Sequence, residues 1–286
     1  YPNPLSSNGK YSRKPWFGCA CCPSNVSRFI PSLPGYVYAV KDNQVYVNLY
    51  LSNKAELIVN KKKVVLEQET GYPWNGDIRV KVAQGNQEFA LKLRIPGWVR
   101  NEVLPSDLYS YADNQKPTYR IIVNGQETAN TLNNGYLSIE RKWKKGDVVK
   151  IHFDMLPRIV KANEKVVDDK GRVSVERGPI VYCAEWPDNK CNVHTVLLNQ
   201  HPQFKVVEKP ELLYGISQLK TDAQALSYDK NGKLITKDTE LTLIPYYAWA
   251  HRGEGDMKVW LPIDVSAASA LPQEVQKWED NGFFKN

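Results

Sequence analysis

The sequence lacks any long apolar run, and histidine, methionine and cysteine are scarce in it. No stretch approaches the roughly 18 consecutive apolar residues that a membrane-spanning helix needs, so we expect no membrane partner. The four histidines lie far apart and show no metal-ligand spacing. The opening residues, Tyr1-Pro2-Asn3-Pro4, show neither an initiator methionine nor a signal-peptide pattern. We therefore expect the chain to begin inside a longer polypeptide.

The 286-residue chain has fewer acidic than basic residues, 31 against 38, which gives it a net charge of +7. Nucleic-acid binding is not predicted, because the basic residues are scattered over strand-like segments instead of forming one stripe. The short runs at residues 61–63 and 142–145 lie next to turns and are typical of solvated hairpin ends. With 42% hydrophobic residues, a chain of this length can bury the cores of two domains.

Most of the chain consists of short strand-like segments broken by turns. These segments cover residues 36–40, 45–51, 55–59, 77–82, 89–95, 119–123, 136–140, 148–153, 172–176, 180–182, 241–244 and 258–261. Asn124-Gly125 is a strong tight-turn signal. Their lengths are typical of β-sandwiches, so we predict an all-β fold. Its sandwiches should cover residues 36–162 and 163–265, between an N-terminal segment, 1–35, and a tail, 266–286.

Helical signals are few. Val26, Phe29 and Ile30 have helical spacing, Ser24 or Asn25 can cap a helix before them, and Pro31 should end it. A second short helix is possible at residues 274–278 of the tail.

Three of the five cysteines fall within four residues, in Gly18-Cys19-Ala20-Cys21-Cys22-Pro23. Adjacent cysteines do not easily bridge each other, because a disulfide favours Cα atoms about 5.5 Å apart and neighbours are held at roughly 3.8 Å. Three interpretations follow from the residues. The thiols can be part of a closed structural zinc site, a metal-activated nucleophile, or inert buried groups at a helix start. The segment holds no histidine, so a metal would need a further ligand from elsewhere.

The remaining cysteines, Cys183 and Cys191, flank a short loop. A disulfide between them is conceivable in an oxidising compartment, but a buried free thiol at Cys183 is favoured by its apolar neighbours. The aromatic segments 72–74 and 246–252 can be sugar-stacking platforms, although packing is the favoured interpretation.

Several strings together resemble glycoside hydrolase family 127, whose characterised members are retaining β-L-arabinofuranosidases. They are residues 16–25 with Arg28, 35–38, 93–98, 135–137 with Trp143 and Gly146-Asp147, 176–182 and 244–253. The resemblance covers most of the chain and ends near Pro262. It implies that residues 1–35 are the last loop and helix of an (α/α)₆-barrel catalytic domain.

The resemblance also implies a mechanism. Cys21 would be both nucleophile and zinc ligand, Cys22 a second ligand, and Cys19 only a neighbour. Cys21 would take the role usually given to a carboxylate and form a glycosyl thioether that water later cleaves. The substrate would be a plant-derived, arabinose-containing glycan.

The sequence departs from the family at one point, because the general acid and the other zinc ligands, a Glu and a Cys, belong to the helical barrel that this chain lacks. The nearest carboxylates, Asp42 and Glu56, stand in turn or strand context. We expect the isolated chain to lack hydrolase activity. The alternative is a non-catalytic carbohydrate-binding or interaction module with a structural or inert cysteine cluster. For Glu176-Arg177-Gly178-Pro179, a structural role is predicted.

Overall fold

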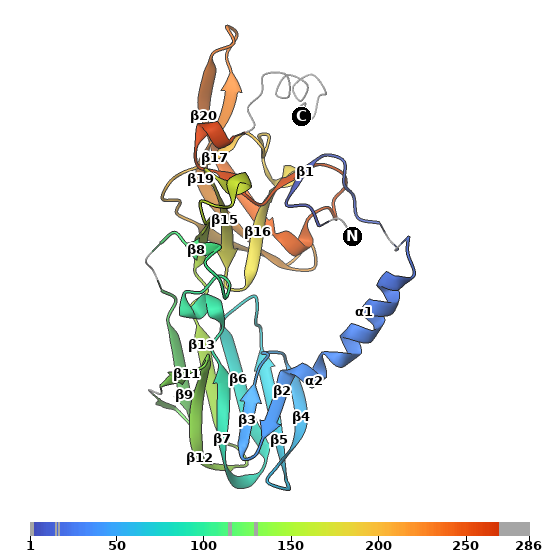
Figure 1. Ribbon diagram of the computed structural model, residues 1–286, viewed down its shortest axis with the longest axis vertical. Helices are drawn as coiled ribbons and strands as arrows, with labels where there is room; N and C mark the ends of the chain where they lie inside the picture. The colour runs from blue at the N-terminus through green and yellow to red at the C-terminus, as the bar shows by residue number, and fades with distance from the viewer. Residues whose placement is uncertain (1–2, 15, 17, 114–115, 129–130, 269–286) are drawn as a thin grey trace. The chain divides into compact units, whose positions relative to one another are not determined.

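The computed structural model describes residues 3–14, 16, 18–113, 116–128 and 131–268 (Figure 1). The chain divides into two compact units. We call residues 15–102 and 115–156 the middle unit, and residues 1–14, 103–114 and 157–286 the terminal unit. The main division precedes Pro157, earlier than the boundary expected after residue 162. The reason is that strand β14 (Pro157–Ala162) pairs with strands of the terminal unit.

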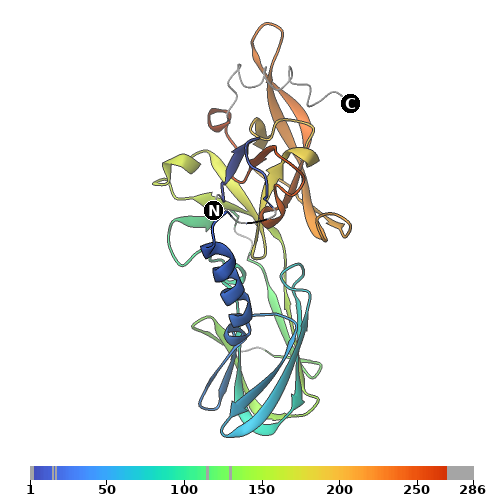
Figure 2. The same cartoon turned by 90° about the vertical axis from the view of Figure 1, so that its right-hand side faces the viewer.

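The middle unit contains two sheets that face each other as a sandwich (Figures 1 and 2). One sheet has the order β10-β9-β13-β6-β5-β4 and contains β4 (Asn53–Val59), β5 (Lys62–Thr70), β6 (Asp77–Gln84), β9 (Tyr119–Val123), β10 (Gln126–Glu127) and β13 (Val148–Phe153). The other has the order β11-β12-β7-β3-β2 and contains β2 (Tyr38–Lys41), β3 (Gln44–Val47), β7 (Asn86–Arg94), β11 (Leu132–Asn133) and β12 (Tyr136–Lys144). Within β6, the alternate residues Ile78, Val80 and Val82 are buried, as expected for a strand with one face on a core.

Aromatic side chains fill much of this sandwich core. Trp143 is fully buried, and its indole N–H donates to the carbonyl of Phe89 at 3.0 Å. Phe153 lies with its ring centroid 5.8 Å from that of Trp98 and 5.7 Å from that of Tyr50. The tight turn expected at Asn124-Gly125 is present between β9 and β10, and both residues have the positive φ angles that this turn requires.

The terminal unit is built on a single 11-stranded sheet, whose main path is β17-β19-β20-β16-β15-β14-β8. Its strands besides β14 are β1 (Ser6–Asn8), β8 (Tyr109–Tyr111), β15 (Arg172–Arg177), β16 (Ile180–Glu185), β17 (Val196–Leu198), β18 (Lys205–Lys209), β19 (Ile216–Tyr228), β20 (Leu234–Pro245), β21 (Asp256–Lys258) and β22 (Leu261–Pro262). Two apolar clusters form its core, one around Tyr182 and Leu219 and one around Trp249 and Met257. The expected all-β fold is confirmed.

Helical turns are short in both units. The 3₁₀ turns are η1 (Gly97–Arg100), η2 (Val167–Asp169), η3 (Trp186–Asp188), η4 (Tyr246–Ala248) and η5 (Val265–Ala267). The α-helices are α1 (Cys21–Ser32) and α2 (Pro34–Val37). None of the helices in the described part of the chain is long and apolar enough to cross a membrane. The helix expected at residues 274–278 lies outside the described residues.

The N-terminal residues belong to the terminal unit, although the segment that follows them enters the middle unit. Strand β1 pairs with β21 near the other end of the chain, with Ser7 opposite Met257. The Ser7 side chain is buried and donates to the carbonyl of Gly255 at 3.1 Å. Arg13 donates from Nε to the carbonyl of Trp249 at 3.1 Å, and its guanidinium lies over the Trp249 ring. Residues 3–14 are therefore an integral part of the terminal unit.

Lys258, in β21, is only 6% exposed. Burial, together with the positive charge of Arg172, lowers the pKa of the Lys258 ammonium to about 8 from an ordinary value of 10.5. Between these values the unfolded chain binds a proton that the folded protein does not, so the unfolding free energy should rise as the pH rises from about 8 to 10.5. Urea unfolding of the wild type and Lys258→Met at pH 7 and pH 10 would measure this. In Lys258→Met, the unfolding free energy should increase less between pH 7 and pH 10 than it does in the wild type. An identical pH dependence in both proteins would contradict the expectation.

Candidate functional site

The cysteine cluster lies at the start of helix α1 in the middle unit. The helix begins at Cys21, earlier than expected, so the prediction of a cap at Ser24 or Asn25 is wrong. Pro23 is in the first turn, where backbone N–H groups have no partner within the helix and a proline is tolerated. The Ser24 hydroxyl instead donates to the carbonyl of Cys21 at 3.0 Å. The helix also continues past Pro31 to Ser32.

The geometry of the cluster is compact. The thiol sulfurs of Cys19, Cys21 and Cys22 all lie within 4.8 Å of one another. Cys19 Sγ is 3.2 Å from Cys21 Sγ, and Cys21 Sγ is 3.7 Å from Cys22 Sγ. Cys19 and Cys21 are exposed and Cys22 is buried. The Cys21 sulfur therefore lies between the other two. The Cys21 residue is exposed to solvent, whereas Cys22 is buried beside it.

These distances suit a zinc ion for one pair of sulfurs. Two thiolates at about 2.3 Å from a tetrahedral zinc are about 3.8 Å apart. The separation of Cys21 and Cys22 matches this tetrahedral edge, whereas that of Cys19 and Cys21 is shorter. Cys21 and Cys22 are also in the first helical turn, whose unpaired N–H groups favour negative charge nearby. The pair therefore fits two positions of a zinc site.

The cluster contains thiols alone in the described part of the chain, with no carboxylate or imidazole among its members. Of the two carboxylates nearest in sequence, Asp42 is in the turn between β2 and β3, and Glu56 forms an ion pair with Lys63 at 2.7 Å. His152 contacts Asp77 at 2.7 Å, and His194 contacts the carbonyl of Ser7 at 2.9 Å. The described residues thus provide a cluster of three thiols, with no carboxylate or imidazole among its members.

The apolar face of α1 is exposed. Val26, Phe29 and Ile30 are 45%, 58% and 58% exposed, and Cys22 is the one buried residue of the helix. Figure 1 shows α1 standing clear of both sheets of the middle unit. The periodicity of these residues correctly indicated a helix, but the face that it predicts is not covered by the described residues of this unit.

The remaining sequence candidates have structural roles. Cys183 and Cys191 are both free thiols, and burial raises the pKa of each. In the segment 246–252, Tyr246 stacks on Trp249 and most of the residues pack into the core, although Tyr247 is 48% exposed. Tyr72 receives a hydrogen bond from the indole of Trp98 at 3.2 Å. These contacts favour packing for Tyr72, Tyr246 and Trp249, whereas Trp74, like Tyr247, is about half exposed.

Glu176 takes part in a partly buried polar cluster of the terminal unit. Its carboxylate accepts a hydrogen bond from the Tyr111 hydroxyl at 3.1 Å, and burial raises the pKa of the Glu176 carboxyl. Arg158 lies over the Tyr111 ring and donates to Asp113 at 2.8 Å. Because β8, β14 and β15 each contribute to the cluster, it holds three neighbouring strands together. This agrees with the structural role predicted for the segment.

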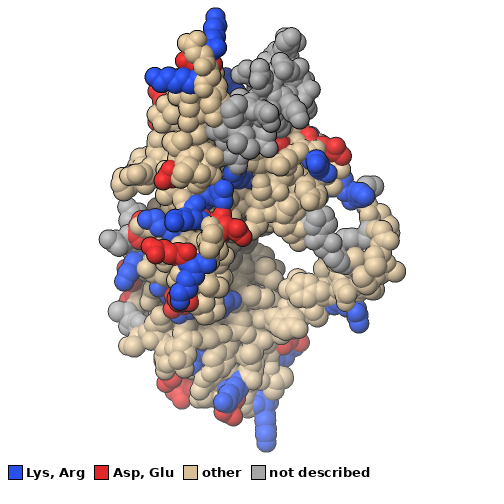
Figure 3. All heavy atoms as spheres, turned by 45° about the horizontal axis from the view of Figure 1, so that its top comes forward, with Lys and Arg blue, Asp and Glu red and all other residues tan. Residues whose placement is uncertain are grey.

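On the molecular face drawn in Figure 3, lysine and arginine side chains are interspersed with aspartate and glutamate. In the middle unit, some surface lysines are paired with acids, as in Lys54 with Glu67 at 3.0 Å. Charge of mixed sign is typical of a solvated surface.

Comparison with known proteins identifies the class to which this fold and site belong. Residues 44–155 match the family description "Beta-L-arabinofuranosidase, GH127 middle domain", and residues 157–262 match "Glycoside hydrolase family 127 C-terminal domain". The chain belongs to glycoside hydrolase family 127. The two matches meet close to the division before Pro157.

Individual relatives are similar over nearly the whole chain. A non-reducing end β-L-arabinofuranosidase of Bifidobacterium longum is 30% identical, over 87% of this chain and 38% of the relative. A solved GH127 β-arabinofuranosidase is 82% identical with a TM-score of 0.91, over 94% of this chain and 42% of its own. The GH127 β-L-arabinofuranosidase of Geobacillus stearothermophilus T6 is 33% identical with a TM-score of 0.77, over 88% and 39%. The chain thus spans less than half the length of these relatives.

Proposed function

We propose that this chain is the C-terminal part of a β-L-arabinofuranosidase that acts with retention through a zinc-bound cysteine. The observation that carries the proposal is the pair of sulfurs of Cys21 and Cys22, 3.7 Å apart at the start of α1. Family membership supports the reaction class, because glycoside hydrolases cleave glycosidic bonds and the similar proteins are named for arabinofuranoside hydrolysis. The substrate would be an arabinose-containing glycan of plant origin.

In this proposal, each cysteine of the cluster has a separate role. Cys21 is nucleophile and ligand, Cys22 is a ligand, and Cys19 is a neighbour. Zinc, when bound, would keep its coordinating thiols deprotonated at neutral pH. Exposure of Cys21 leaves its sulfur accessible to a sugar, and burial of Cys22 is suited to a residue that stays in place.

The reaction would proceed in two displacements. Cys21 Sγ attacks the anomeric carbon, the carbon–sulfur bond forms, and the bond to the glycosidic oxygen breaks as that oxygen takes a proton from a general acid. Water then attacks the same carbon, releases the sugar and restores the thiolate of Cys21. Two inversions give overall retention.

The proposal places the missing groups in a part of the protein outside this chain. By resemblance to the family, a helical barrel would supply the glutamic acid that protonates the leaving oxygen, together with a Glu and a Cys as zinc ligands. Helix α1 would be the last helix of that barrel. Its exposed Val26, Phe29 and Ile30 support this, since such a stripe is typical of a helix that packs on another element. The chain alone would be inactive.

Metal removal tests this function. The complete protein should hydrolyse an activated β-L-arabinofuranoside to arabinose of retained configuration, and a chelator should abolish this activity until zinc is restored. Product configuration by NMR and the zinc content by elemental analysis are the measurements.

This chain on its own serves as the control. It should hydrolyse nothing and should hold less than one zinc per molecule, because two or three thiols leave a tetrahedral site incomplete. Full zinc occupancy in the isolated chain would show that the local thiols suffice. Full activity of the complete protein after verified metal removal would contradict the zinc role.

A further inference from the structure

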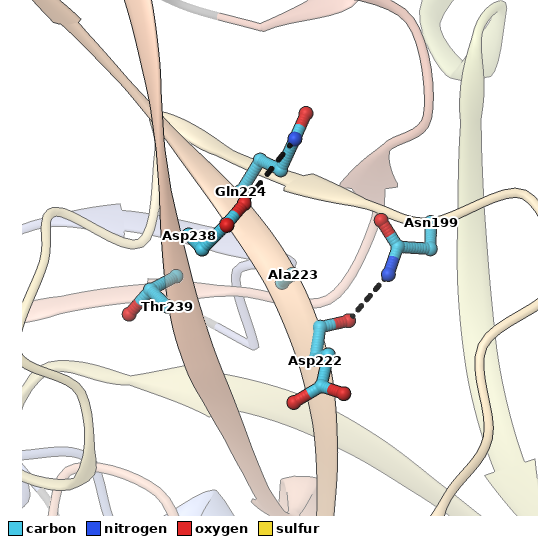
Figure 4. Close-up of a pocket in the computed structure, with 6 residues that line it drawn as sticks. All are labelled: Asn199, Asp222, Ala223, Gln224, Asp238 and Thr239. Carbon is cyan, nitrogen blue, oxygen red and sulfur yellow. Dashed lines mark hydrogen bonds between the residues drawn. The ribbon is translucent and has the colours of Figure 1, made fainter.

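Two groups of polar contacts in the terminal unit differ in how they relate to the cysteine cluster. One lies on the open surface of β19 and β20 (Figure 4). There Asn199 donates to the carbonyl of Asp222 at 3.0 Å, and Gln224 donates to Asp238 at 3.4 Å. Asn199, Asp222 and Asp238 are exposed, so water can satisfy their remaining hydrogen-bonding capacity. The other group joins the N-terminal segment to residues 246–249, and this segment continues along the chain to the cysteines.

The η4 turn and the residue after it hold the N-terminal segment at two points. The Tyr246 hydroxyl donates to the carbonyl of Pro4 at 3.1 Å. Arg13 donates from Nε to the carbonyl of Trp249 at 3.1 Å and from Nη2 to that of Tyr247 at 3.4 Å. Carbonyls at the end of a helical turn lack partners within the turn and are ready acceptors. Because Pro4 and Arg13 lie on either side of β1, the segment is fixed before and after that strand.

The acceptor side of this contact is itself held from below. Ala250, which follows Trp249, has a left-handed backbone with a φ of +61°, a conformation that residues with a side chain disfavour. Its N–H donates to Glu185 Oε1 at 2.6 Å, and the buried Glu185 carboxylate is ion-paired with Arg252. Backbone strain held in place in this way is found mainly at functional sites. The carbonyl of Trp249 is therefore offered to Arg13 from a rigid support.

The connection from Arg13 to the cysteine cluster is short. Arg13 lies six positions before Cys19 in the sequence. An extended chain spans at most about 3.3–3.6 Å per residue, so six residues reach roughly 20 Å. On the other side of the cluster, Cys22 is the one buried residue of α1, so packing of that helix within the described residues restrains the cysteines little. An anchor at Arg13 thus limits how far the cysteine loop can move.

We propose that Arg13 is a positioning residue for the cysteine nucleophile: held by the carbonyls of Tyr247 and Trp249, it restrains the loop that leads to Cys21. The link to catalysis rests on the proposed function, whereas the anchor rests on contacts within the terminal unit. A restrained loop has less conformational freedom to lose before the sulfur reaches the anomeric carbon. Arg13 touches neither sugar nor metal in this assignment and acts through the chain. The segment 246–252 then has a role besides packing.

Substitution of Arg13 in the complete enzyme tests the proposal. Arg13→Met should lower kcat by about tenfold with KM and zinc content close to wild type, because a displacement of about 1 Å can cost about 10²-fold in rate. Methionine keeps an apolar stem over the Trp249 ring and removes both donors. Arg13→Lys keeps the charge and one donor, so it should recover part of the loss. Lys14→Ala is the matched control, because it removes an exposed positive charge one residue closer to the cysteines and should leave kcat unchanged.

Hydrogen exchange in this chain alone gives a readout that does not depend on hydrolysis. Peptides that cover residues 9–14 and 18–22 should exchange at least threefold faster in Arg13→Met than in the wild type. The same peptides should exchange at the wild-type rate in Lys14→Ala. Thermal melting would show which variants are folded, and Arg13→Lys carries the comparison where Arg13→Met does not fold.

Four results would overturn the proposal. They are wild-type kcat in folded Arg13→Met, a loss of kcat no larger than the loss of folded protein, an equal loss of kcat in Lys14→Ala, and unchanged hydrogen exchange in Arg13→Met. The proposed hydrolase function fails by a different observation. It fails when the wild-type complete protein does not cleave an activated β-L-arabinofuranoside, whatever the exchange rates show.

Discussion

Cys21→Ser in the complete enzyme should lower kcat on an activated β-L-arabinofuranoside by about 10⁴-fold or more, as loss of a nucleophile does in other enzymes. A serine hydroxyl is a far weaker nucleophile at neutral pH than a thiolate. The substitution also removes one sulfur of the Cys21–Cys22 pair, whose separation fits a tetrahedral zinc. Initial rates over a range of substrate concentrations would measure the loss.

Cys19→Ser is the matched control for this experiment. Cys19 Sγ is closer to Cys21 Sγ, at 3.2 Å, than Cys22 Sγ is, at 3.7 Å, and Cys19 is exposed, but the proposal gives it no role in chemistry. The variant should retain most of the wild-type kcat and zinc content, whereas Cys22→Ser should lose zinc and activity together. Wild-type rates in Cys21→Ser would contradict the assignment of Cys21 as nucleophile. A loss of kcat in Cys19→Ser equal to that in Cys21→Ser would contradict the assignment of Cys19 as a neighbour.

Arg252→Met should destabilise the terminal unit by about 3–5 kcal/mol, the usual cost of leaving a buried charge unpaired. Arg252 forms an ion pair with Glu185, whose side chain is almost wholly buried, and pairs with Asp188 at 2.5 and 2.9 Å. The Glu185 carboxylate also accepts from the backbone N–H of Ala250 at 2.6 Å. Without the guanidinium, two acidic groups would remain close together with no opposite charge. Urea unfolding would measure the loss.

Lys220→Met is the control for this prediction. Lys220 pairs with Glu240 at 2.5 Å in the same sheet, but both side chains are substantially exposed, and exposed pairs contribute about 0–1 kcal/mol. A double variant with Glu185→Gln should recover part of the stability lost in Arg252→Met, because the unpaired charge is then removed. A loss in Arg252→Met no larger than that in Lys220→Met would contradict the argument.

Much of the strand pattern could be predicted from the sequence, and its failures have physical causes. Strand β5 does not appear among the predicted segments, because a register shift between Val65 and Leu66 breaks the alternation of buried and exposed residues. Strand β19 was also missed. Its buried positions include the polar residues Ser217, Gln218 and Thr221, so hydrophobicity does not reveal its inward face.

For the candidate site too, features set by neighbouring residues could be predicted from the sequence, and features set by distant residues could not. Adjacency of Cys21 and Cys22 is a local property, so the sequence alone predicted that their sulfurs lie close together. The start of α1 was misplaced because Ser24 and Asn25 are good capping residues, whereas the helix tolerates Pro23 in its first turn. The polar cluster around Glu176 depends instead on the pairing of β8, β14 and β15, which brings Tyr111 and Glu176 together across 65 positions of the sequence. Such long-range pairing cannot be read from a local pattern.

The pairing of β1 with β21 has a consequence for the order in which the protein folds. Ser7 and Gly255 are hydrogen-bonded partners 248 positions apart in the sequence. During synthesis β1 emerges well before its partner β21. The middle unit, complete once β13 has emerged, can fold during this interval. The pairing of β1 with β21 can form only after β21 has been synthesised, so the terminal unit is completed after the middle unit.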